Sequence, residues 1–205
     1  MKLGLIVESG PQGAEVQVLP YLAEQIAPGV ECSCVTFRNK PALIGECGPA
    51  TANLLDDGCD KVLIVWDLYP AWREDGCRPD CVEDCVAIRA ALRTAGVSDD
   101  DGRVAMICIR EELEAWLVAD GRALSAVLSR PTHPVRVGDT RSPDTARNPK
   151  VKLRNIFRQH GRSDYSDRTH AIQIVQALPG HNRIGRSQSF QRFTCKVQAI
   201  GRAQP

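Results

Sequence analysis

The stretch Lys61-Val62-Leu63-Ile64-Val65-Trp66-Asp67 decides the fold of this chain. Five apolar residues in a row, bounded by charged residues, are typical of a strand that is buried on both faces. The runs 2–7 and 103–109 have the same apolar character, and residues 30–37 show the alternation of a fourth strand. We therefore predict four strands in the first part of the chain.

Amphipathic patterns typical of helices alternate with these strands. They cover residues 14–27, 42–57, 81–95 and 111–119. Buried strands that alternate with amphipathic helices predict an α/β fold, in which a parallel sheet is covered by helices on both faces.

The last third of the chain has a different character. Residues 131–149 contain four prolines and few apolar residues, and they predict a loop. Three helical patterns follow, near residues 149–159, 168–178 and 187–199. We predict an α/β domain over residues 1–130, and a loop with a basic helical extension packed on it over residues 131–205.

Charge is divided unevenly along the sequence. The net charge is +1, but residues 1–102 carry 17 acidic and 8 basic side chains, and residues 103–205 carry 8 and 18. Residues 147–205 alone hold 12 basic and 2 acidic side chains. A basic segment attracts phosphates, and an acidic cleft attracts divalent cations. Two solvated surfaces of opposite charge would give the same division, so charge alone leaves both interpretations open.

Length and composition exclude several classes of protein. A chain of 205 residues with 43% hydrophobic residues is too long for a disulfide-stapled miniprotein and too apolar for a disordered chain. No apolar run approaches the ~18 residues that a membrane span requires. Glu8 interrupts the N-terminal apolar run before a secretory signal could form. We expect a cytoplasmic protein that does not interact with membranes.

The nine cysteines are expected to be reduced thiols in that compartment. Cys77, Cys81 and Cys85 are spaced four apart, so they would share a face if one helix carried all three. They lack the close Cys-x-x-Cys pairs and the clear fourth ligand of a zinc site. A packed helix face and a metal site both remain open for these three residues.

Acidic residues follow three of the predicted strands. Glu8 follows the first strand, Asp67 the third, and Glu111, Glu112 and Glu114 the fourth. Ligands of open parallel sheets bind outside the carboxyl ends of the strands, so these acids are expected at one edge. Carboxylate oxygens suit Mg²⁺ or Mn²⁺, which neutralise phosphate charge and activate water. Each acid taken alone could instead be a helix cap or a solvated loop residue.

Several stretches give the chain a resemblance to known families. Residues 65–72, 113–120, 148–150 and 187–193 read VWDLYPAW, LEAWLVAD, NPK and SQSFQRF. With these stretches the chain resembles the domain-of-unknown-function family 4276, which is regarded as Toprim-like. Val7-Glu8-Ser9-Gly10 after the first strand and Asp67 after the third also resemble the Toprim arrangement of topoisomerases, primases and OLD-family nucleases.

This resemblance implies a fold for metal-dependent phosphoryl transfer. Glu8 matches the Toprim glutamate that is associated with general acid/base work, and Asp67 matches the first residue of an Asp-x-Asp metal pair. Tyr69 stands at the second position of that pair, and a phenol is a poor Mg²⁺ ligand at neutral pH. The missing carboxylate would come from Glu114, Asp75 or Asp120. Relatives in phage-defence systems are often paired with an ATPase, which implies an ATPase partner here.

Basic residues of the C-terminal helical patterns are candidates for nucleic-acid binding, because their cations suit phosphate oxygens. They are Lys150, Lys152, Arg154, Arg183, Arg186 and Arg192. Phe190 and Phe193 could stack on single-stranded bases. Their spacing of three on a helix favours a place in the core instead.

The acids at one sheet edge and the basic C-terminal segment predict a nuclease that cleaves DNA or RNA with Mg²⁺ or Mn²⁺. The resemblance implies that it is Toprim-like and that it acts as the effector of an antiviral defence system. Glu8 would be the acid/base and also a metal ligand, and Asp67 would be the principal metal ligand. Glu114 would be a second ligand or an orienting catalytic acid, and Asp120 a further ligand. The alternative is a non-catalytic subunit that assembles with an ATPase, which the loss of the second Asp at Tyr69 favours. A phosphatase or nucleotide-processing enzyme is a third possibility. The sequence leaves self-association open.

Overall fold

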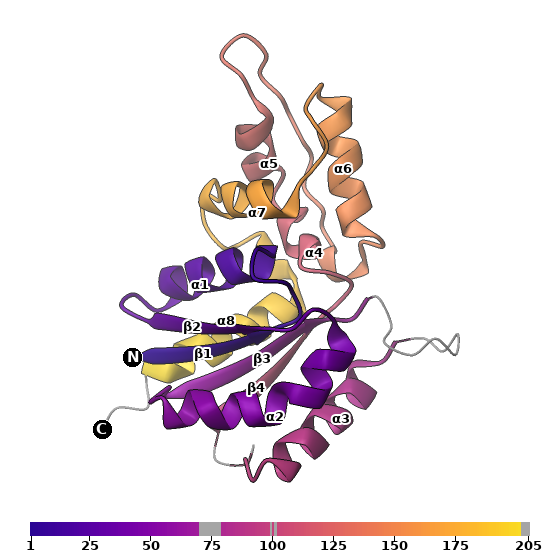
Figure 1. Cartoon of the computed structure of the whole chain (residues 1–205). Coiled ribbons are helices and arrows are strands. Elements are labelled where there is room, and N and C mark those ends of the chain that lie inside the picture. The colour runs from indigo at the N-terminus through magenta and orange to yellow at the C-terminus, as the bar shows by residue number, and fades with distance from the viewer. Residues whose placement is uncertain (70–78, 99, 101, 202–205) are drawn as a thin grey trace. The chain divides into compact units, whose positions relative to one another are not determined.

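A computed structural model of the chain describes residues 1–69, 79–98, 100 and 102–201 (Figure 1). The chain divides into two compact units. The first consists of Met1–Cys108 together with the residues from Arg192 on, and the second consists of Ile109–Gln191. The first break lies near the end of the fourth strand, whereas the sequence pattern placed a boundary at residue 130. The end of the last helix belongs to the first unit.

The first unit contains a four-stranded parallel sheet in the order β2-β1-β3-β4. Its strands are β1 (Lys2–Val7), β2 (Glu31–Thr36), β3 (Lys61–Asp67) and β4 (Val104–Ile109). In the register of the central strand, Leu5 lies level with Cys34 on β2 and with Leu63 on β3. This arrangement confirms the predicted α/β fold class.

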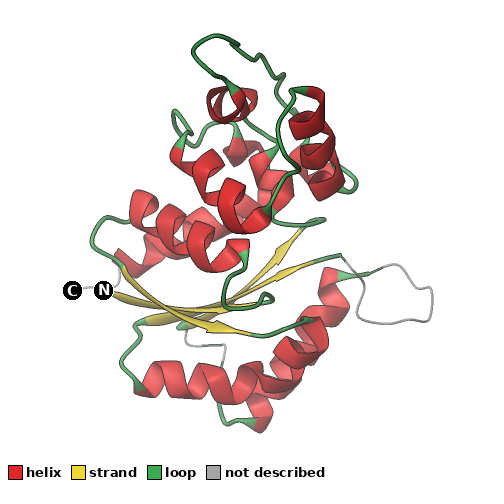
Figure 2. Cartoon of the chain, turned by 45° about the horizontal axis from the view of Figure 1, so that its top comes forward, coloured by secondary structure: helices red, strands yellow, loops and turns green. Residues whose placement is uncertain are grey.

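Helices cover both faces of this sheet (Figures 1 and 2). They are α1 (Ala14–Ile26), α2 (Lys40–Asp56), α3 (Cys81–Thr94) and the end of α8 (Gln188–Gly201). α2 and α3 pack on one face, where Ile64 and Trp66 of β3 enter the apolar core. The two helices approach closely at Gly48, where an added Cβ would lie 2.3 Å from the carbonyl oxygen of Ala91. No helix in the described part of the chain has the length and apolar character needed to cross a membrane.

The second unit is built from short helices joined by loops. They are α4 (Glu114–Leu117), α5 (Gly121–Leu128), η1 (Pro143–Thr145), α6 (Pro149–Gln159), α7 (Asp167–Gln176) and η2 (Ile184–Arg186). The predicted helix over residues 111–119 contracts to the single turn α4. The sequence pattern did not predict α5, which begins where the Asp120 side chain accepts a hydrogen bond from the backbone N–H of Arg122.

Phe190 and Phe193 are core residues, with only 2% and 0% of their surface exposed. Phe190 packs edge-on against Trp116, with 5.2 Å between ring centroids. A buried ring offers no face on which a nucleic-acid base could stack. The core interpretation of these two residues is therefore confirmed.

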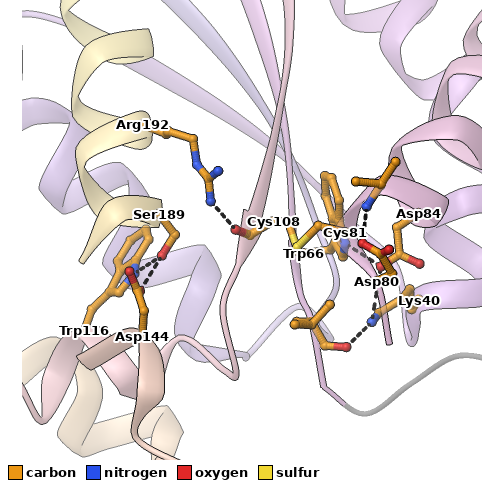
Figure 3. The surroundings of a disulfide bond; sticks show 12 residues. Lys40, Trp66, Asp80, Cys81, Asp84, Cys108, Trp116, Asp144, Ser189 and Arg192 are labelled. Carbon is orange, nitrogen blue, oxygen red and sulfur yellow. Dashed lines mark hydrogen bonds and ion pairs between the residues drawn. A yellow bond between two sulfur atoms is a disulfide. The ribbon is translucent and has the colours of Figure 1, made fainter. Parts of the chain in front are cut away.

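Cys81 and Cys108 form a disulfide, so the expectation that all thiols are reduced is wrong for this pair. The fold places the start of α3 beside the end of β4, with 5.9 Å between the two Cα atoms (Figure 3). Cys81 therefore has no free thiol to offer to a metal site with Cys77 and Cys85, and Cys77 itself lies outside the described residues. Spacing along one helix predicted neighbours within α3, but the bond joins two different elements.

Reduction of this disulfide should lower the free energy of unfolding by about 2–4 kcal/mol, because the bond closes a loop between residues 27 positions apart. Urea unfolding with and without dithiothreitol measures the loss. Cys81→Ser should show the same loss and should no longer respond to dithiothreitol. Cys85→Ser, which removes a free thiol from the same helix, is the matched control. An unchanged midpoint for Cys81→Ser would contradict the prediction.

Candidate functional site

The order of the strands creates a topological switch point between β1 and β3. From β1 the chain proceeds to β2 on one side, and from β3 it proceeds to β4 on the other side. Ligands of open parallel sheets bind outside the carboxyl ends of the strands at such a point. Glu8 directly follows β1, and Asp67 is the last residue of β3. Two of the predicted carboxylates therefore lie at the position where the fold favours a ligand.

Glu8 lies in surroundings that favour its protonated form. Burial raises the pKa of Glu8 to about 7, against the opposing effects of the Lys40 charge and of hydrogen bonds from the backbone N–H groups of Lys40 and Asp67. Its Oε2 atom is buried and has no hydrogen-bond partner within the described chain. Such an oxygen can be satisfied by its own proton or by a cation. A carboxyl group that titrates near neutral pH suits general acid/base chemistry.

A buried lysine, Lys40, pairs with a buried aspartate, Asp84, in the first unit (Figure 3), and the Lys40 charge acts on Glu8. Lys40 is 1% exposed, and its Nζ atom donates to the carbonyl oxygen of Leu68 at 2.7 Å. The same Nζ lies 3.6 Å from Oδ2 of Asp84, which also accepts a hydrogen bond of 2.8 Å from Trp66 Nε1. These contacts fix a positive charge close to the carboxyl ends of β1 and β3.

The sequence pattern singles out neither Lys40 nor Asp84. Lys40 opens α2 shortly after the end of β2, so it follows a strand as Glu8 does. The amphipathic pattern predicts this helix only from residue 42, and a lysine carries none of the metal-ligand signal of an acidic residue at a strand end. Asp84 lies in the first turn of α3, where an acid is common for reasons of the helix dipole alone.

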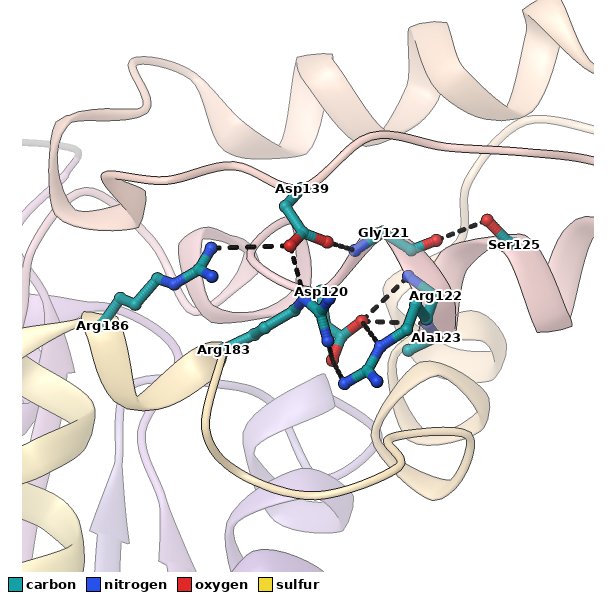
Figure 4. A network of polar contacts seen from close by, with 8 residues as sticks. All are labelled: Asp120, Gly121, Arg122, Ala123, Ser125, Asp139, Arg183 and Arg186. Carbon is teal, nitrogen blue, oxygen red and sulfur yellow. Dashed lines mark hydrogen bonds and ion pairs between the residues drawn. The ribbon is translucent and has the colours of Figure 1, made fainter.

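Glu114 and Asp120 belong to the second unit and have structural partners there. Glu114 is 4% exposed, lies 3.6 Å from Lys150 Nζ and accepts a hydrogen bond of 3.4 Å from the Tyr165 hydroxyl. Asp120 is fully buried and caps α5 by accepting the backbone N–H of Arg122 at 2.8 Å (Figure 4). These two predicted metal ligands therefore stabilise their own unit.

Three of the stretches that carry the family resemblance meet in this unit. Glu114 of LEAWL pairs with Lys150 of NPK. Trp116 of LEAWL donates a hydrogen bond from Nε1 to Ser189 Oγ of SQSF at 2.9 Å (Figure 3). Burial alone would lower the pKa of Lys150, but Glu114 and Asp167 raise it overall. Packing and charge pairing inside the unit thus account for these motif residues.

Half of the predicted nucleic-acid ligands are engaged in ion pairs. Lys150 lies 2.7 Å from Asp167. Arg183 and Arg186 both contact Asp139, the latter at 3.6 Å (Figure 4). A cation with a carboxylate partner must exchange that partner before it can bind phosphate, so these residues are poorer candidates than their charge suggests.

The other three predicted ligands are exposed. Lys152 donates to Thr140 Oγ1 at 2.8 Å, and Arg154 lies on the solvent face of α6. Arg192 belongs to the first unit, where it lies 3.5 Å from the carbonyl oxygen of Cys108. The six residues therefore do not form one surface within a single unit.

The switch point offers a divalent cation two carboxylates and would need a substrate to supply the remaining ligands. Within the described ranges, no group of three or more His, Cys, Asp and Glu side chains could hold a metal ion, and Asp75 lies outside those ranges. Proteins nevertheless hold Mg²⁺ through one or two carboxylates together with the phosphates of a substrate. Glu8 and Asp67 provide two such carboxylates, and the buried Oε2 of Glu8 is an acceptor that a cation would satisfy.

The raised pKa of Glu8 predicts a pH-dependent stability. The carboxyl group titrates near 4.5 when the chain is unfolded and near 7 when it is folded. Between these pH values the folded chain binds more protons than the unfolded chain. The stabilising contribution of Glu8 is therefore fully present below pH 4.5 and is lost as the pH rises to 7. Glu8→Gln, which cannot ionise, should gain about 2–3 kcal/mol over the natural chain at pH 8 and almost nothing at pH 4. Urea unfolding at both pH values tests this, and an equal change at both would contradict it.

Comparison with known proteins adds one finding. No curated protein and no solved structure matches the chain. One family model, described as a domain of unknown function, matches residues 16–198. That range includes all four resembling stretches, and β1 with Glu8 lies just before it. The chain therefore belongs to the DUF4276 family of proteins.

Proposed function

We propose that this protein is a Toprim-like nuclease that hydrolyses phosphodiester bonds of DNA or RNA with the help of Mg²⁺ or Mn²⁺. The observation that carries this proposal is the arrangement at the switch point. There, Glu8 has a pKa of about 7 and is hydrogen-bonded by the backbone N–H of Asp67. A proton-transfer group thus lies beside a potential metal ligand, at the sheet edge where the fold favours a ligand.

Glu8 would transfer the protons of the reaction. In its ionised form it can accept a proton from the attacking water, and in its neutral form it can donate one to the leaving oxygen. A pKa near 7 keeps both forms populated at neutral pH. Burial favours the neutral form of Glu8 most strongly, and Lys40, held by Leu68 and Asp84, opposes it by favouring the ionised form. Asp67 would hold the cation, which neutralises phosphate charge and polarises the phosphorus when it is bound.

Cleavage assays with the full chain test this proposal. Single- and double-stranded DNA and RNA are incubated with Mg²⁺ or Mn²⁺, and EDTA serves as the metal-free control. We expect metal-dependent cleavage that is lost in Asp67→Asn and kept in Asp57→Asn, an exposed residue at the end of α2. Titration calorimetry should show Mn²⁺ binding that Asp67→Asn abolishes, because Asp67 would hold the cation. Absence of both cleavage and Mn²⁺ binding would reject the proposal.

A non-catalytic subunit is the second candidate function. Tyr69 in place of a second aspartate favours it, as does the absence of a three-ligand metal group among the residues with described coordinates. In this case Mn²⁺ does not bind, and Glu8→Gln and Asp67→Asn leave assembly with a partner unchanged. An ATPase partner and a role in antiviral defence are compatible with both candidates.

A further inference from the structure

The second unit contains a hollow lined mainly by basic and polar residues, in contrast to the acidic residues at the switch point of the first unit. Its volume is about 210 Å³, and three separate segments of the unit line it. Arg110 follows β4, Arg141 and Ser142 belong to the loop before η1, and Arg186 and Gln188 lie at η2 and the start of α8. Drug-sized ligands occupy roughly 300–1,000 Å³, so this hollow is suited to a single small group.

Arginine side chains give the hollow its charge. Arg110 and Arg141 form no ion pair with any carboxylate in the described part of the unit. Arg186 lies 3.6 Å from Asp139, but Asp139 also pairs with Arg183 (Figure 4). Asp139 is therefore shared between two guanidinium groups. The three arginines outnumber Asp139 and Asp144, the carboxylates beside them, so the hollow keeps an excess of positive charge.

Asp144 also lines the hollow, but its carboxylate is already occupied. It accepts hydrogen bonds from Ser187 Oγ at 2.6 Å, from the backbone N–H of Gln188 at 2.6 Å and from Ser189 Oγ at 3.3 Å. These donors lie at the start of α8, so Asp144 caps this helix and neutralises its positive end. Attraction of an anion to the hollow therefore comes from the arginines and not from the helix.

The geometry points to a phosphate-binding pocket formed by Arg110, Arg141 and Arg186. A planar guanidinium donates paired hydrogen bonds to phosphate oxygens, and converging guanidinium groups bind a doubly charged anion better than scattered ones. Ser142 and Gln188 also line the hollow, and both residue types can supply neutral donors. We assign the phosphate to a nucleic-acid strand. This assignment rests on the proposed function, whereas the existence of the pocket does not depend on it.

Binding measurements on the full chain in EDTA test the pocket without cleavage. The probes are inorganic phosphate and a short single-stranded oligonucleotide, with and without a 5′-phosphate. Arg110→Gln/Arg141→Gln should weaken oligonucleotide binding by about tenfold or more. It should also reduce the slope of log K against the logarithm of the salt concentration by about 1–2. Arg136→Gln/Arg147→Gln removes the same charge from exposed positions of the same unit, outside the pocket and outside the predicted nucleic-acid ligands, and should have a much smaller effect. Circular dichroism checks that each variant is folded.

Each outcome decides a separate point. Equal losses of binding affinity in the two double variants would overturn the pocket, because diffuse charge attraction would then explain binding. A natural chain that binds neither probe would also overturn it. Binding of inorganic phosphate alone, lost in the pocket variant, would support the pocket and assign it to small phosphate esters. A stronger response to the 5′-phosphate would place a strand end in the pocket. Binding that persists where no cleavage is found would reject the proposed function and leave the pocket standing.

Discussion

Glu8→Gln should reduce metal-dependent cleavage by about 10²–10⁴-fold, because glutamine cannot exchange a proton near neutral pH. Glutamine has nearly the same shape and keeps an oxygen that can accept the backbone N–H groups of Lys40 and Asp67. The substitution therefore removes proton transfer and leaves the surroundings in place. Single-turnover cleavage rates, measured from pH 5 to pH 9, give the size of the loss.

The pH profile distinguishes a role in chemistry from a role in structure. The rate of the natural chain should change its slope near the pKa of Glu8, about 7. The residual activity of Glu8→Gln should lack that feature. Since this variant is expected to be more stable at pH 8, unfolding cannot explain its loss of activity.

Glu31→Gln provides the matched control for this experiment. Glu31 begins β2 and lies level with Lys2, at the amino ends of the strands and away from the switch point. It should keep the full rate. A Glu8→Gln variant that cleaves as fast as Glu31→Gln would remove Glu8 from the mechanism.

The sheet could be predicted from the sequence because its central strands are buried on both faces. Such strands require uninterrupted apolar residues, and the runs 2–7 and 61–67 have no other ready explanation. α5 was not predicted because its cap, Asp120, has the same side chain as a metal ligand. A single acidic residue carries no signal that distinguishes these two roles, and only the backbone N–H groups around it decide between them.

The candidate site could be predicted only in part. Glu8 and Asp67 could be proposed from the sequence because strand ends mark one edge of a parallel sheet. Glu114 follows a strand as well, but it belongs to the second unit, where Lys150 pairs with it. Sequence order shows that a residue follows a strand, but it does not show which of the two units the next helix belongs to. The disulfide was missed for a related reason, because the rule on thiols concerns the compartment and not the geometry of the fold.

Lys40→Met should lower the free energy of unfolding by about 3–5 kcal/mol, the largest effect on stability that we expect. Lys40 and Asp84 are both 1% exposed, and the Lys40 Nζ atom lies 3.6 Å from the Asp84 carboxylate. Methionine fills the space of the lysine stem but leaves the buried carboxylate without its cation. The Glu8 carboxyl group loses the same charge, so its pKa should rise further and the pH dependence of stability should move upward.

A double-mutant cycle decides whether pairing with Asp84 causes this loss. Replacement of both charges by apolar residues, in Lys40→Met/Asp84→Leu, should recover much of the stability, because no uncompensated charge then remains buried. Trp66 Nε1 would lose its acceptor in the double variant, so about 1 kcal/mol should stay lost. Lys196→Met, at an exposed position on α8, is the control for loss of a lysine charge and should change stability by less than about 0.5 kcal/mol. If Lys40→Met were as mild as Lys196→Met, the buried pair would not organise the switch point, and the fixed charge beside Glu8 would have to come from another group.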